Sequence, residues 1–153
     1  MYSSTIPVPH TYAEWVSVLD ELKNKTDDEA VLEAMQKGTV EWQTGVAERF
    51  AQKLIDTINY RMNGATDKFQ KELNRSFGQE RNIVIALLSL RKELSFLAKA
   101  INLPALPEGD RTHYHQLVVD HANKIQKSLE DSAKADRTGK LASIIRNNRV
   151  NAL

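Results

Sequence analysis

The stretch from Ile83 to Ile101, IVIALLSLRKELSFLAKAI, is the most apolar part of this chain and has hydrophobic residues at helical spacing. Gaps of four and three residues alternate along Ile83, Leu87, Leu90, Leu94, Leu97 and Ile101. Such spacing places them on one stripe of an α-helix. A second row beside it contains Val84 and Leu88, and a face this broad predicts neighbours on more than one side. The charge-free run 82–90 is less than half of the ~20 residues that cross a bilayer, which predicts a core helix of a soluble protein.

The length and composition of the chain predict a single domain. The chain has 153 residues, 41% of them hydrophobic, which is enough for one substantial core. Pro7 and Pro9 predict an extended N-terminal arm over residues 1–10, followed by one helical domain over residues 11–153. The absence of cysteine excludes disulfides and thiolate chemistry, and no secretory signal opens the sequence, so a cytoplasmic location is expected.

Capping residues mark where several helices should begin. Thr11 with Glu14, Thr26 with Glu29, and Ser76 with Gln79 each have the spacing of a capping box. These boxes predict a helix ending near Asn24, a second helix that Gly38 stops, and the central helix over about 77–102. A further helix is expected after Asp110 or Thr112, and a last short one before Asn147.

The segment from Thr39 to Arg75 predicts one long helix. Thr39 is a suitable cap, and Trp42, Val46, Phe50, Leu54, Ile58 and Met62 follow at a spacing of four. Phe69 and Leu73 keep the same helical phase, so the helix is expected to continue from about 40 to 75 through Gly64. The glycine should weaken it by ~1 kcal/mol relative to alanine.

Together these patterns predict an all-α fold, an up-and-down bundle of four to six helices. The long helix (about 40–75) should pack on the central apolar helix (about 77–102), because short connectors favour antiparallel neighbours. Trp15 and Trp42 share the phase of aliphatic neighbours and are interpreted as core residues.

No catalytic motif or metal site is found in the sequence. His113, His115 and His121 cluster, but no pair among them has the i,i+3 or i,i+4 spacing that two ligands on one helical face require. We therefore interpret His121 as a partly buried histidine on the inner helix face. Gly139-Lys140 lacks the first glycine of a phosphate-binding loop. The sequence accordingly predicts a non-enzymatic protein without a cofactor or metal.

Arg91 is a charged residue within the second apolar row of the central helix. An unpaired buried charge is costly, so Arg91 should either extend to the rim of the core or pair with a carboxylate. We treat it as a candidate for a buried ion pair, with an anion-binding site as the alternative.

The first functional hypothesis is an interaction or scaffold protein that works through protein–protein contacts. The predicted long helix would extend roughly 15 Å beyond the central helix at 1.5 Å per residue. Phe69 and Leu73 would lie on that projection and form a candidate self-association surface, unless the first two helices or the N-terminal arm cover it. A homo-oligomer is therefore expected, and no membrane contact.

The second hypothesis is a helical accessory subunit that contacts nucleic acid through the basic C-terminal segment 134–149. Candidate contacts to nucleic acid or another partner are Arg137, Lys140, Arg146 and Arg149, and Asp136 is the single acidic residue among them. No aromatic residue accompanies these bases for stacking on nucleobases. A solvated tail that offsets the acidic N-terminal residues is the alternative.

Overall fold

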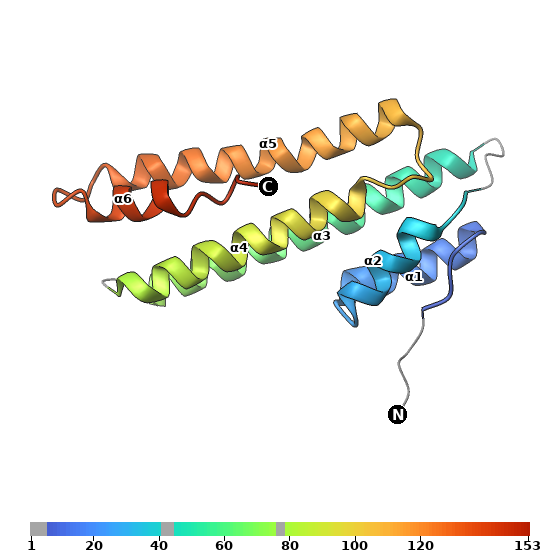
Figure 1. Cartoon of the computed structure of the whole chain (residues 1–153), viewed down its shortest axis with the longest axis horizontal. Coiled ribbons are helices and arrows are strands. Elements are labelled where there is room, and N and C mark those ends of the chain that lie inside the picture. Colours follow the sequence, from blue (N-terminus) through green and yellow to red (C-terminus); the bar gives the residue numbers. More distant parts are fainter. Residues whose placement is uncertain (1–5, 41–44, 76–78) are drawn as a thin grey trace. The chain divides into compact units, whose positions relative to one another are not determined.

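Six helices account for 77% of the residues that the computed structural model describes, which are residues 6–40, 45–75 and 79–153. In chain order they are α1 (Tyr12–Asn24), α2 (Asp28–Lys37), α3 (Val46–Arg75), α4 (Glu80–Ile101), α5 (Glu108–Ala133) and α6 (Lys140–Asn147) (Figure 1). These helices pack on one another, and no strand occurs among the described residues, so the predicted all-α bundle is confirmed. None of the described helices is long and apolar enough to cross a bilayer.

The chain divides into two compact units, and α3, α4 and α5 each contribute residues to both. Unit 1 consists of Met1–Arg61 and Lys99–His115, and therefore holds α1, α2 and the first part of α3. Unit 2 consists of Met62–Ala98 and Gln116–Leu153, and holds most of α4, the second part of α5 and α6.

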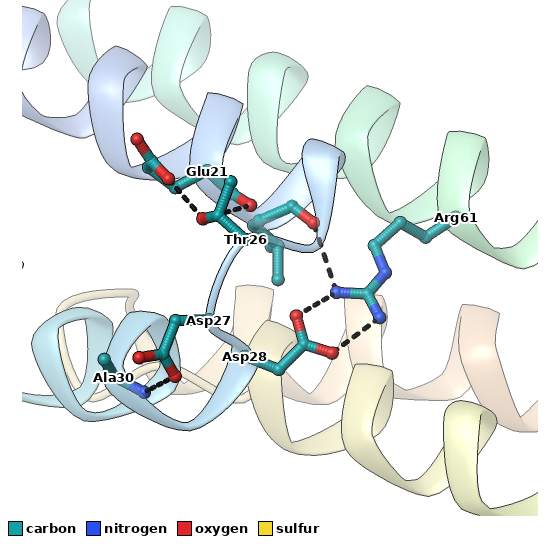
Figure 2. Close-up of polar contacts among 7 residues, drawn as sticks. Glu21, Thr26, Asp27, Asp28, Ala30 and Arg61 are labelled. Atoms are coloured by element: carbon teal, nitrogen blue, oxygen red, sulfur yellow. Dashed lines mark hydrogen bonds and ion pairs between the residues drawn. The ribbon is translucent and has the colours of Figure 1, made fainter. Parts of the chain in front are cut away.

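Of the predicted capping boxes, one is found in the structure and another is displaced by one residue. At α1 the Thr11 hydroxyl accepts a hydrogen bond from the Glu14 amide at 3.2 Å, and the Glu14 carboxylate accepts one from the Thr11 amide at 3.0 Å. This capping box is confirmed. The predicted box at Thr26 is wrong by one residue, because Asp27 caps α2 and accepts from the Ala30 amide at 3.1 Å. Thr26 instead donates to Glu21 (Figure 2).

The long helix is continuous through Gly64, as predicted, but it begins at Val46 rather than near residue 40. Thr39 does not cap it, because tertiary hydrogen bonds hold Thr39 outside the helix. Its amide donates to the Pro9 carbonyl at 3.0 Å, and its carbonyl accepts from Trp15 Nε1 at 2.8 Å. Trp42 and Ser76 lie outside the described residues.

The connector between α4 and α5 is shorter than predicted. Because α5 begins at Glu108, Asp110 and Thr112 lie inside its first turns and do not cap it. Glu108 and Asp110 supply negative charge to that first turn, where it suits the helix dipole. At its other end, α5 stops at Ala133, before Gly139, whose φ of 74° forms the turn into α6.

Trp15 lies at the centre of the core of unit 1. Its side chain is 1% exposed, and its ring centroid lies 4.6 Å from that of Phe50. A Cβ atom at Gly38 would lie only 2.5 Å from Trp15 Cζ2, so glycine is what allows the chain after α2 to approach the indole closely. The indole therefore fixes the packing of α1, α3 and the end of α2.

Unit 1 also contains a buried ion pair that the sequence analysis did not identify. The Arg61 side chain is 1% exposed, and its two terminal nitrogens donate to the Asp28 carboxylate at 2.8 and 2.9 Å (Figure 2). Arg61 also donates to the carbonyl of Leu22 at 3.1 Å. The guanidinium thereby ties α3 to the end of α1 and the first turn of α2.

Candidate functional site

The surface of unit 2 brings together residues from both functional hypotheses. A pocket of about 740 Å³ lies among α3, α4, α5 and α6. Its apolar wall includes Phe69, Leu73, Ile83, Leu87, Leu129 and Ile144. Arg137 and Lys140 line the same pocket from the segment between α5 and α6. Two of the predicted nucleic-acid contacts therefore lie beside the two predicted self-association residues.

The predicted exposure of Phe69 is wrong. Phe69 is only 3% exposed and Leu73 is half-buried, because both lie against the other helices of unit 2 around this pocket. The end of α3 therefore does not present the phenylalanine on a free apolar projection.

The segment before α6 owes its shape to Asp136. The Asp136 carboxylate accepts hydrogen bonds from the Leu141 amide at 3.0 Å, the Thr138 amide at 3.1 Å and the Thr138 hydroxyl at 2.9 Å. These donors, first the Leu141 amide and then Thr138, hold the pKa of Asp136 below its usual value. The carboxylate is thus engaged within its own turn, which positions Arg137 and Lys140 at the edge of the pocket.

Gln126 holds α6 against α5. This side chain is 2% exposed, its oxygen accepts from the Val150 amide at 3.0 Å, and its nitrogen lies 3.5 Å from the Ile145 carbonyl. Asn151 adds a bond of 2.9 Å to Asn123. Since these contacts fix both the end of α6 and the residues after it, α6 runs back along α5 (Figure 1). Residues of α6 line one side of the pocket.

The four candidate basic residues are all exposed to solvent. Arg149 donates to Asn151 at 3.1 Å, but no carboxylate lies within ion-pair distance of Arg137, Lys140, Arg146 or Arg149 in the part of the chain that the structure describes. Lys134, in contrast, pairs with Asp131 at 3.3 Å. Four exposed cations without an ion pair thus lie within thirteen residues of sequence, and two of them, Arg137 and Lys140, border the pocket together with the carboxylate of Asp136.

Arg91 is half-buried on α4 and has no ion pair with any described residue. The buried ion pair lies instead at Arg61, which occupies an inward position three residues after Ile58. That polar residue in an apolar row was a signal available in the sequence. Its partner Asp28, 33 positions away, could not be identified from spacing.

The histidines do not form a metal site among the described residues, where no group of three or more potential ligands is found. His121 is half-buried on α5, and its Nε2 lies 3.4 Å from the Thr66 hydroxyl. Burial lowers the pKa of His121, and the positive charge of Lys124 lowers it further.

α4 also carries an exposed apolar pair. Ile85 and Leu88 are 52% and 36% exposed and lie on the same helix face, three residues apart. The exposed bases Arg81 and Lys92 flank them along the helix. Neighbouring helices therefore cover only part of the apolar surface of α4. The uncovered part, Ile85 and Leu88, is a candidate contact surface.

Comparison with known proteins does not extend this description. No family model, curated protein or solved structure matches the chain. Its function must therefore be inferred from the geometry of unit 2 and from the charges of the two units.

Proposed function

We propose that the protein is a non-enzymatic helical interaction protein that works through protein–protein contacts and associates with copies of itself. The observation that carries this proposal is the opposite charge of the two units. Unit 1 has 12 acidic and 8 basic residues, a net charge of −4, and unit 2 has 8 acidic and 13 basic residues, a net charge of +5. Unit 1 of one copy is therefore electrostatically complementary to unit 2 of another.

Ile85 and Leu88 are the apolar contacts that we assign to this association, in place of Phe69 and Leu73. Among the described residues of unit 1, Tyr60 is the exposed large hydrophobic side chain, and its exposed fraction is 59%. Pairing α4 with the α4 of another copy would bring the flanking bases Arg81 and Lys92 together. A head-to-tail contact between unlike units avoids that repulsion.

Replacing Ile85 and Leu88 with glutamate should abolish self-association while leaving the fold intact. The added charges cannot be buried at a contact without a large desolvation cost. Analytical ultracentrifugation at micromolar to high micromolar concentration should show a concentration-dependent rise in mass for the wild type that the double variant lacks. Added salt should weaken the wild-type association, because screening acts on the charged surroundings of the contact.

Gln70→Glu is a control for added charge, with one negative charge where the double variant has two, since Gln70 is exposed on α3 of unit 2 and lies away from the α4 pair in sequence. It adds negative charge to the same unit and should keep the association. A wild-type protein that stays monomeric at high micromolar concentration and low salt would refute self-association. Association that survives both substitutions would refute the assignment to Ile85 and Leu88.

A second candidate function is contact with nucleic acid through residues 134–149. Its support is the exposure of Arg137, Lys140, Arg146 and Arg149, none of which has a carboxylate within ion-pair distance among the described residues. Free cations on one segment suit a polyphosphate backbone, and the lack of an aromatic residue in this segment favours phosphate contact over base stacking.

If this second function is right, fluorescence anisotropy should show binding of short DNA or RNA that weakens steeply with salt. The logarithm of the affinity should fall with log salt by about 0.9 per phosphate contact on duplex DNA. Replacing both Arg146 and Arg149 with alanine should flatten that slope by about 2 without unfolding the protein. No binding to either nucleic acid at tens of micromolar protein and low salt would remove this function.

A further inference from the structure

We propose that the pocket of unit 2 binds a small single-chain amphiphile with an anionic head group, such as a medium-chain or long-chain carboxylate. This inference is independent of the association through α4, because the pocket and the pair Ile85 and Leu88 are different surfaces. The volume of about 740 Å³ falls within the range of small-molecule sites, roughly 300–1,000 Å³.

The lining of the pocket selects an apolar tail. All four helices around it contribute aliphatic or aromatic side chains, and two of these, Phe69 and Leu87, are buried. Leu73, Leu141 and Ile144 are half-buried, so they supply the accessible part of the wall. Mostly apolar walls with a few polar groups at one edge are typical of ligand sites, and a hydrocarbon chain would replace water along these side chains.

The charges at the edge select the head group. Arg137 and Lys140 line the pocket, are exposed, and have no carboxylate within ion-pair distance in the described part of the chain. Of the two acidic residues in the lining, Asp136 accepts hydrogen bonds from Thr138 and the Leu141 amide and keeps its negative charge, so the edge formed by Asp136, Arg137 and Lys140 has a net charge of +1. The other, Glu80, belongs to the first turn of α4. An anionic head is therefore attracted to the Arg137 and Lys140 edge and repelled from the α4 edge.

The test is a titration of the full-length protein with three amphiphiles that share one tail: dodecanoate, dodecyl maltoside and dodecyltrimethylammonium, each below its critical micelle concentration. Nuclear magnetic resonance of the methyl groups should show saturable shifts at Leu73 and Ile144 with dodecanoate. We expect the cationic amphiphile to bind at least tenfold more weakly. Equal affinity for the anionic and cationic amphiphiles, or shifts confined to Ile85 and Leu88, would overturn the proposal.

Two pairs of charge variants make the test specific. Arg137→Gln with Lys140→Gln should weaken dodecanoate binding about tenfold, which corresponds to about 1.4 kcal/mol and is within what two exposed ion pairs contribute together. Arg146→Gln with Arg149→Gln removes the same charge from the same segment but outside the pocket lining, and should leave the affinity within about twofold. If the two double variants weakened dodecanoate binding equally, the proposal would be overturned. The attraction would then come from the overall positive charge of the segment and not from a head group bound beside Arg137 and Lys140.

Two further experiments complete the test: a variant whose side chain fills the pocket, and a binding measurement with lipid vesicles. Leu73→Trp should occupy the pocket with a larger side chain and abolish dodecanoate binding while circular dichroism shows an unchanged helix content. Vesicles of anionic phosphatidylglycerol separate a free amphiphile from a membrane head group. Binding to vesicles without saturable binding of monomeric dodecanoate would overturn the proposal.

Discussion

Replacing Trp15 with alanine should lower the free energy of unfolding by about 3–5 kcal/mol. The indole is 1% exposed, packs on Phe50 and donates from Nε1 to the Thr39 carbonyl at 2.8 Å. Removing it leaves a cavity against α3 and deprives a carbonyl of its hydrogen-bond donor. Urea unfolding followed by far-UV circular dichroism measures the change, and an unchanged m-value would show that the loss reflects stability.

Two further variants separate the contributions of the indole. Trp15→Phe keeps an aromatic ring but loses the bond to Thr39, so it should cost clearly less than alanine. Gly38→Ala should cost about 1–3 kcal/mol in the wild type, because its Cβ would lie 2.5 Å from Trp15 Cζ2. In the Trp15→Ala background that cost should largely disappear, since the clashing ring is gone. Additive costs for the two substitutions would contradict the described contact.

The helices could be predicted from the sequence because their signals are local. The apolar stripe from Ile83 to Ile101 and the preserved phase of Phe69 beyond Gly64 depend only on spacing along one helix. The starts of α3 and α5 could not be predicted in the same way. Thr39 has the chemistry of a cap, but its hydrogen bonds to Pro9 and Trp15 hold it outside the helix.

The candidate site was only partly predictable, because its arrangement depends on contacts between residues that are far apart in the sequence. The basic character of Arg137 and Lys140 can be read directly from the sequence, whereas their position beside Phe69 depends on α6 running back along α5. That return is fixed by the buried amide of Gln126, a contact across nineteen and twenty-four positions of sequence. The uncovered state of Ile85 is likewise a property of packing, because an exposed and a buried isoleucine have the same periodicity.

Asp28→Ala is the second substitution for which we expect a large effect, a loss of about 2–4 kcal/mol in the free energy of unfolding. The expected value is below that of a fully buried pair, because the Asp28 side chain is 36% exposed while that of Arg61 is 1% exposed. Without the carboxylate, the buried guanidinium loses its two charge-assisted hydrogen bonds to Asp28 and keeps its bond to the Leu22 carbonyl. Removing one partner of an ion pair is destabilising when the other is buried, because the remaining charge loses a favourable interaction while it stays desolvated.

The opposite substitution should be better tolerated. Arg61→Met keeps much of the volume of the side chain and removes the buried charge, and the partly exposed Asp28 can then be hydrated, so the cost should be smaller than that of Asp28→Ala. Glu29→Ala is the matched control, because Glu29 is an exposed acid in the same first turn of α2 and contributes under about 1 kcal/mol through the helix dipole. Urea unfolding of the three variants should therefore rank Asp28→Ala as the most destabilising. A larger loss for Arg61→Met than for Asp28→Ala would show that the arginine stabilises unit 1 mainly through its packing and its bond to Leu22, and that the ion pair itself contributes little.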